Sequence, residues 1–167
     1  MEAFLRLLQQ PEYVHILINP LPVYGVGVGL IALILALFLR NRAAHITALA
    51  VIFLGAASAW PVAYYGEEAY DRVLSMSDSD GSAWLAAHSH RADKLVWSFY
   101  ALAVISATAI VAPIKFPKIA TPLTILTLVF AFGSLGAGGY IAYAGGKVRH
   151  REFRNEPPPP KPAEREE

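Results

Sequence analysis

Cysteine is absent from this chain of 167 residues. Without a thiol, the protein has no disulfide, no thiolate metal site and no covalent attachment of haem through cysteine. Metal held by histidine and carboxylate, or haem held non-covalently, is unaffected by this exclusion. The sequence also lacks a G-x-S-x-G nucleophile motif and the G-x-G-x-x-G and G-K-[ST] nucleotide loops. We therefore do not predict an enzyme.

Charge is the second scarcity. Charged residues make up 16% of the chain and hydrophobic residues 55%, whereas soluble domains carry about 25% charged residues. The formal net charge of +1 argues against a nucleic-acid partner. The charges also avoid four long runs, each near the roughly 20 apolar residues that a helix needs to cross a bilayer. These features predict an integral membrane protein, with the lipid bilayer as its first partner.

We expect an all-α fold, a four-helix bundle of membrane spans with a short helical extramembrane cap between spans two and three. Proline and glycine set its details. Pro61 predicts a kink in the second span, and Pro113 predicts the end of the third. Gly25 and Gly29 form a G-x-x-x-G pair, which allows two helices to approach closely. The predicted spans are residues 21–39, 44–65, 95–112 and 121–144.

The two ends of the chain differ from this membrane domain, which we place at residues 13–154. Residues 1–12 contain a short apolar face, so they are either an interfacial helix or a flexible terminus. Residues 155–167 include four consecutive prolines and scattered charge. That tail has too little apolar surface to fold by itself, and we expect it to be disordered.

Four spans place the N-terminus, the polar stretch 66–94 and the tail on one side of the membrane. The two tight turns on the other side contain no acidic residue and four basic ones, Arg40, Arg42, Lys115 and Lys118. A raw count of Lys and Arg favours a cytoplasmic polar side, whereas the density in short turns and the flanks of the first span favour the reverse. We predict a bacterial inner-membrane protein whose polar side is extracytoplasmic.

The candidate site is a set of histidines and carboxylates that this topology gathers on the polar side. Imidazole and carboxylate are good ligands for zinc, copper or iron. The spacing matches no self-sufficient metal motif, so solvated helix ends or a basic surface strip would explain the same residues. The predicted site residues are His15, Glu67, Glu68, His88, His150 and Glu152.

Haem b is the alternative cofactor. It needs two axial ligands that face each other across a bundle, and histidine is the usual choice. All histidines except His45 lie on the polar side, so such a haem would lie near the membrane interface. Finding two correctly opposed histidines there requires more coincidence than binding a metal ion.

The sequence resembles a family of uncharacterised bacterial four-span membrane proteins. Members have an N-H-[FL]-P-type approach to the first helix, G-E-x-A after the second span, a His-Glu pair before the third and G-G-x-I-R-H-x-E-I-R after the fourth. The matching stretches here are HILINPLP at 15–22, GEEA at 66–69, AHSHRA at 87–92 and GGKVRHREFR at 145–154. The resemblance covers about residues 13–154, and the last motif is its most specific part.

Two positions depart from that family. Pro20 stands where members often have a second histidine, and Ser89 stands where they have glutamate. If those family residues are ligands, a site here would be weaker. The resemblance implies no activity, but it groups part of the candidate set as one constellation, namely His15, Glu67, His88, His150 and Glu152.

Three functional hypotheses follow. The leading one is a metal- or haem-binding membrane protein that is an accessory to electron transfer. The second is a structural or assembly subunit of a larger membrane complex or homo-oligomer, in which glycine-rich faces and the proline tail contact other subunits. A transporter that acts as an oligomer is the third.

Overall fold

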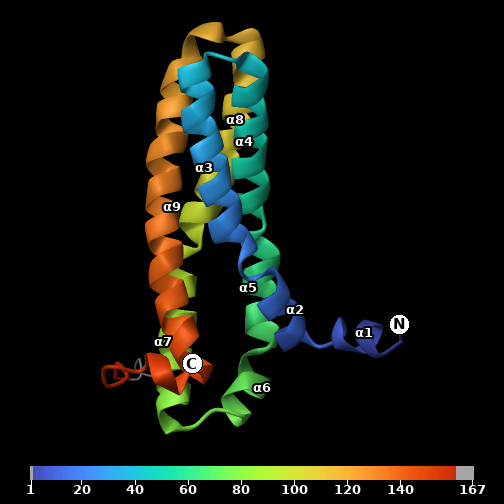
Figure 1. Cartoon of the computed structure of the whole chain (residues 1–167), viewed down its shortest axis with the longest axis vertical. Helices are drawn as coiled ribbons and strands as arrows, with labels where there is room; N and C mark the ends of the chain where they lie inside the picture. The colour runs from blue at the N-terminus through green and yellow to red at the C-terminus, as the bar shows by residue number, and fades with distance from the viewer. Residues whose placement is uncertain (1, 161–167) are drawn as a thin grey trace, which may run out of the picture.

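The computed structural model describes residues 2–160 and is all-helical in that part of the chain. Four long apolar helical segments pack against each other, which confirms the predicted four-helix bundle. In Figure 1 both tight turns lie at the top, while the N-terminus, α6 and the C-terminal segment lie at the bottom. We call the bottom the histidine end. The upper part, built from α3, α4, α8 and α9, is the four-helix part.

Four segments are long and apolar enough to cross a membrane: Pro11–Leu39, Arg42–Glu68, Ser79–Lys115 and Pro117–Arg149. The third contains 37 residues, which at about 1.5 Å per residue is roughly 55 Å of helix. The hydrocarbon core of a bilayer is only about 30 Å thick. Because Arg91, Asp93 and Lys94 lie in its first half, we place the histidine end at and beyond the membrane surface.

The first span consists of α2 (Pro11–Ile18) and α3 (Leu21–Leu39), and α3 has the bounds predicted for span one. His15 lies in α2, outside the predicted span 21–39. Pro20 and Pro22 lack the N–H groups that would bond to carbonyls of α2. The helix is therefore interrupted between α2 and α3. Figure 1 shows α2 bending away from the axis of α3 toward α5.

The second span is divided in the same way. It contains α4 (Arg42–Ala57) and α5 (Ala59–Glu68), with the interruption at Ser58. Pro61 cannot donate to the carbonyl of Ala57, so the predicted kink is confirmed. The Ser58 hydroxyl donates instead to the carbonyl of Gly55 at 2.6 Å. Both N-terminal spans therefore turn away from the bundle axis near the same level.

The polar stretch forms α6 (Tyr70–Ser75) and α7 (Ser79–Leu95), which leads into α8 (Trp97–Lys115). Residues 75–82, SMSDSDGS, have the composition of a loop. However, α7 already begins at Ser79 because Asp78 caps it, its Oδ1 accepting from the Gly81 N–H at 2.7 Å. Instead of forming a separate cap, α7 packs along α9. Pro113 was predicted to end the span, yet it is tolerated in the last turn of α8.

The fourth span begins after a short 3₁₀ turn, η1 (Pro117–Ile119), and forms α9 (Ala120–Arg149). The prediction ended this span near residue 144, before the glycine pair. The helix instead continues through Gly145 and Gly146, since packing against α7 outweighs their low helix propensity. A second 3₁₀ turn, η2 (Arg151–Phe153), follows.

The segments outside the spans are short. Helix α1 (Glu2–Leu7) projects sideways at the histidine end in Figure 1, with exposed Phe4, Leu5 and Leu7, as an interfacial helix would. The described tail residues 155–160 are irregular, but Glu156 contacts α9. Residues 161–167, the rest of the predicted tail, lie outside the described residues.

Two separate cores hold the molecule together. The larger fills the four-helix part, where Leu33, Ile52 and Leu102 are fully buried. The smaller fills the histidine end, between α7 and α9, around Trp84 and Val148. In that half α2 pairs with α5 and α7 pairs with α9, and the two pairs meet at few points.

Candidate functional site

Two of the six predicted site residues meet where the helix pairs approach each other. His15 of α2 and His88 of α7 have ring centres 6.4 Å apart and ring planes 79° apart. Both side chains are half-buried. The contact joins the α2–α5 pair to the α7–α9 pair near the membrane surface.

The hydrogen bonds of the two histidines fix their tautomers. His15 Nδ1 lies 2.9 Å from the carbonyl oxygen of Val62 on α5, and His88 Nδ1 lies 3.0 Å from that of Ile141 on α9. A carbonyl oxygen only accepts, so each Nδ1 carries the proton and each Nε2 carries a lone pair. Within residues 2–160, neither Nε2 has a hydrogen-bond partner. The pair therefore presents two unused nitrogen ligands.

Each imidazole lies against a glycine. A Cβ built on Gly66 would lie 2.9 Å from His15 Cε1, and one on Gly145 would lie 2.9 Å from His88 Nδ1. Any larger residue would displace the ring. The glycine follows the accepting carbonyl by one turn in both cases, Val62 before Gly66 and Ile141 before Gly145. Both histidines thus have the same surroundings, an accepting carbonyl and a glycine one turn later on the neighbouring helix. Each of the four spans contributes one part of the site.

The other four predicted residues do not join this pair in a metal cluster. Glu67 and Glu68 are exposed at the end of α5. His150 Nδ1 donates within its own turn to Glu152 Oε1 at 2.9 Å, and its ring stacks on Phe153. That hydrogen bond lowers the pKa of the Glu152 carboxyl, together with a backbone hydrogen bond that contributes more. No group of three histidine or acidic side chains suited to a metal ion occurs among the residues described.

The remaining histidines are separate. His45 is hydrogen-bonded at 3.1 Å to Thr124 in the four-helix part, near the turns. His90 is exposed on α7, two residues from His88. Both provide natural controls for the histidine pair.

An ion-pair clamp that the sequence reasoning missed holds the end of α9 to α7. Asp78 accepts from Arg154 Nη1 at 2.9 Å and pairs with Arg151 at 2.8 Å. Arg154 also donates to the carbonyls of Lys147 and Val148, in the last turn of α9, where carbonyls otherwise lack partners. The hydrogen bond from Arg154 is the main reason that the pKa of Asp78 falls to about 2. The sequence could have identified Asp78 as the N-cap of a helix, but not its ion pairs with Arg151 and Arg154.

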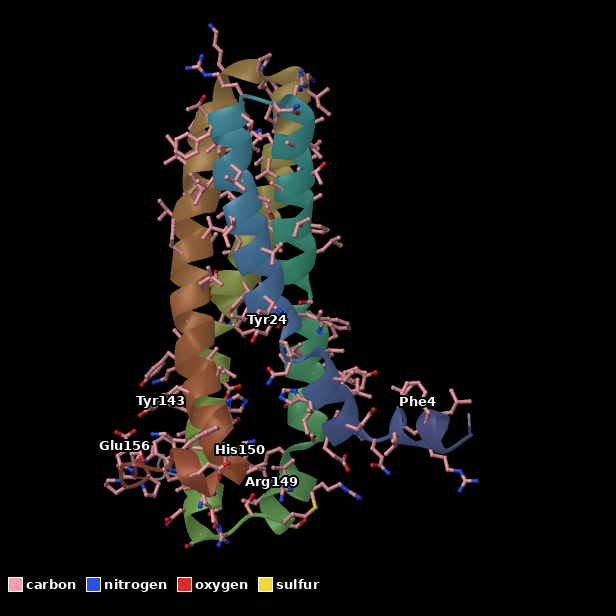
Figure 2. All side chains as sticks on the ribbon, in the orientation of Figure 1. Phe4, Tyr24, Tyr143, Arg149, His150 and Glu156 are labelled. Atoms are coloured by element: carbon pink, nitrogen blue, oxygen red, sulfur yellow. The ribbon has the colours of Figure 1, made fainter. Side chains whose placement is uncertain are left out.

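A buried lysine forms the second missed contact. Lys147 is 4% exposed, and its Nζ lies 3.9 Å from the ring centre of Tyr143 and 4.4 Å from that of Trp84. It donates to Glu156 Oε1 at 2.8 Å, and this hydrogen bond lowers the pKa of the Glu156 carboxyl. Figure 2 shows Tyr143 and Glu156 on the side of α9 away from α5. The hydrogen bond between Lys147 and Glu156 therefore anchors the tail to α9. These contacts are distinct from the histidine pair.

No family model matches the chain, and no curated protein or solved structure matches it either. The resemblance to a four-span bacterial family stays a prediction, and the function rests on the geometry of the site.

Proposed function

We propose that this integral membrane protein holds one haem b between His15 and His88 and serves electron transfer. The observation that carries the proposal is the pair of imidazoles whose Nδ1 protons go to backbone carbonyls at 2.9 Å and 3.0 Å, leaving both Nε2 lone pairs unused. Metal-ligating histidines usually donate their other ring N–H in this way, which fixes the ring and makes the free nitrogen a better ligand.

The number of ligands favours haem over a bare metal ion. A zinc, copper or iron ion bound by protein alone needs three or four side chains, and the described residues bring no such group together. Haem brings four nitrogen ligands in its own ring and asks the protein for axial ligands only. Two opposed histidines are thus a complete set for haem and an incomplete one for an ion.

The spacing also fits. Two imidazoles on opposite sides of one metal, with metal–nitrogen bonds of about 2 Å, have ring centres roughly 6 Å apart. The ring centres of His15 and His88 are 6.4 Å apart. Gly66 and Gly145 give each ring the space to lie close to a neighbouring helix. The two rings come from different helix pairs, α2–α5 and α7–α9, so a flat group held between the rings would lie between those pairs.

Haem with two histidine ligands supplies a reversible one-electron couple. With His15 and His88 both used as ligands, such a haem would leave no place for oxygen to bind and would serve electron transfer. The absence of cysteine excludes a haem attached covalently through cysteine and is compatible with a non-covalent haem b. The protein's own part is to orient both imidazoles through the backbone carbonyls of Val62 and Ile141.

The first experiment is a reduced-minus-oxidised absorption spectrum with haem and metal analysis on the detergent-purified full chain. Wild type should show stoichiometric haem b, removable with acidic acetone. His15→Ala and His88→Ala should each lose the six-coordinate spectrum, whereas His90→Ala and His45→Ala should keep it. Haem retained unchanged in both site variants would contradict the proposal. Stoichiometric metal without haem would replace it with the metal-ion hypothesis.

The proposal also includes the side of the membrane on which the histidine end lies. We propose that the histidine end is extracytoplasmic in a bacterial inner membrane, as the basic residues Arg40 and Arg42 after the first span favour. Because the chain has no cysteine, Ser77→Cys and Asn41→Cys each introduce a single thiol at opposite ends. An impermeant maleimide should label only Ser77→Cys in intact cells, and the opposite result would invert the topology.

A structural or assembly subunit is the second candidate function. It is favoured by Gly133, Gly136 and Gly139 of α9, where an added Cβ would meet nothing within 4 Å. Outward glycines in membrane helices allow another helix to approach closely. Native mass spectrometry of the gently extracted protein tests this function, since a chain that is monomeric and without partners at every detergent concentration would exclude it.

A further inference from the structure

Two arginines lie beside the histidine pair, on its side away from the membrane. Arg149 follows Gly145 by one turn on α9, so it lies on the same face of that helix as the glycine under His88. Its Nη1 donates to the carbonyl oxygen of Met76, just after α6, at 3.3 Å. Figure 2 shows Arg149 at the lower end of α9.

Arg72 occupies the corresponding place on the other side of the pair. Its Nε donates to Glu12 Oε1 at 2.5 Å, and Glu12 precedes His15 by one turn on α2. Arg72 is part of α6, and Met76, which accepts from Arg149, directly follows that helix, so α6 connects the two arginines. Each histidine therefore has an arginine one turn farther from the membrane.

Both guanidinium groups retain donors for a ligand. Arg72 uses Nε for Glu12, and Arg149 uses Nη1 for a long bond to Met76. The remaining N–H groups of the two side chains have no partner in the part of the chain that the structure describes. The Arg72 side chain is 62% exposed, so a ligand can reach it while its Nε keeps the bond to Glu12.

Resting on the proposed function, we infer that Arg72 and Arg149 receive the two carboxylates of the bound haem. A haem b carries both carboxylates on one edge, and that edge needs water or cationic donors as partners. Arginine binds carboxylate through two parallel N–H donors. The arginines therefore orient the carboxylate edge away from the membrane and make the site selective for porphyrins with free acids.

The test compares two ligands on the full-length apoprotein in detergent, haem b and its dimethyl ester. Binding is followed by the Soret band, and the His15→Ala, His88→Ala double variant measures partition into detergent. Wild type should bind haem b at least about tenfold more tightly than the ester, as charge-assisted hydrogen bonds predict. In Arg72→Gln, Arg149→Gln that preference should disappear, with Arg42→Gln at the turns as the matched control.

The midpoint potential gives an independent readout. A nearby positive charge disfavours the oxidised, more positive iron, so Arg149→Gln should lower the potential and Arg149→Lys should restore most of it. Equal wild-type affinity for haem b and its ester would overturn the arginine inference and leave the histidine site standing. Failure of both porphyrins to bind above the double-variant background would overturn the proposed function itself.

Discussion

In the four-helix part, a Cβ on Gly55 would lie 2.7 Å from backbone atoms of Gly25 and Val26, because α3 and α4 touch along their main chains. At the histidine end, a Cβ on Gly145 or Gly66 would meet an imidazole ring instead. The backbone of a packed helix cannot move away from an added Cβ, whereas an imidazole side chain can rotate away from it. The first use of glycine determines whether the helices assemble, and the second determines where an imidazole ring lies.

The two regions also differ in what drives their packing. Within lipid, apolar burial gains little, so close contact and small residues hold helices such as α3 and α4 together. The core around Trp84 lies beyond the hydrocarbon by our placement, where burying one such side chain is worth about 2–3 kcal/mol. The proposed function is assigned to the histidine end, where the two helix pairs meet at few points and polar groups can be solvated.

The largest expected effect is on assembly. Gly55→Leu should destabilise the protein by about 3 kcal/mol or more, because the new side chain is forced into the backbone of α3. Thermal unfolding in detergent, followed by circular dichroism, measures it. Gly136→Leu is the control of the same size in open space. Equal stability of the two variants would mean that α3 and α4 are not in contact at these glycines.

The next effect separates the ligand from the fold. Gly145→Ala should push the His88 ring off its bond to Ile141 and weaken haem binding by about tenfold to a hundredfold, the usual cost of losing such an orienting bond. Titration of the apoprotein with haem measures the affinity. The melting temperature of the apoprotein should hardly change, and a collapse of that temperature would show that Gly145 serves folding instead.

A smaller effect concerns the clamp at Asp78. Its carboxyl has a pKa of about 2 in the folded protein against an ordinary 3.8, so the clamp stabilises fully above pH 4 and loses its effect as pH falls through 2. Asp78→Asn keeps the helix cap and removes the charge. Thermal midpoints of both proteins from pH 6 to pH 2 should differ at the upper end and converge at the lower. A difference independent of pH would refute the ion-pair explanation.

The smallest effect distinguishes the two candidate functions. Gly136→Ala adds a methyl group in open space and improves helix propensity, so an isolated chain should gain up to about 1 kcal/mol. If another helix packs there, the same change should weaken the assembly. Thermal melting measures the stability of the isolated chain, and native mass spectrometry measures whether the assembly is weakened.

The sequence predicted much of the fold because charge-free runs and prolines act locally. The start and end of α3 and the kink near Pro61 follow from such signals. The predicted fourth span ends at residue 144, before Gly145 and Gly146, whereas α9 continues past them because α7 packs against it. Long-range packing cannot be inferred from a glycine pair alone.

The candidate site was predicted in part for a similar reason. Topology could place His15 and His88 on one side of the membrane, and the structure brings their rings together. It could not reveal that Glu67 and Glu68 face solvent or that His150 turns toward Glu152. It also could not show that Val62 and Ile141 accept from the histidines, since every residue has a carbonyl and only the fold selects among them.

The division of the site among α2, α5, α7 and α9 has a consequence for the order of events during synthesis. His15 emerges first, but Ile141 and Gly145, which orient His88, lie in the last span. A proteolysed or incompletely inserted chain would lack one side of the proposed ligand cage. Haem loading would therefore follow insertion of the fourth helix, and the colour of the protein would report that the whole chain had reached the membrane.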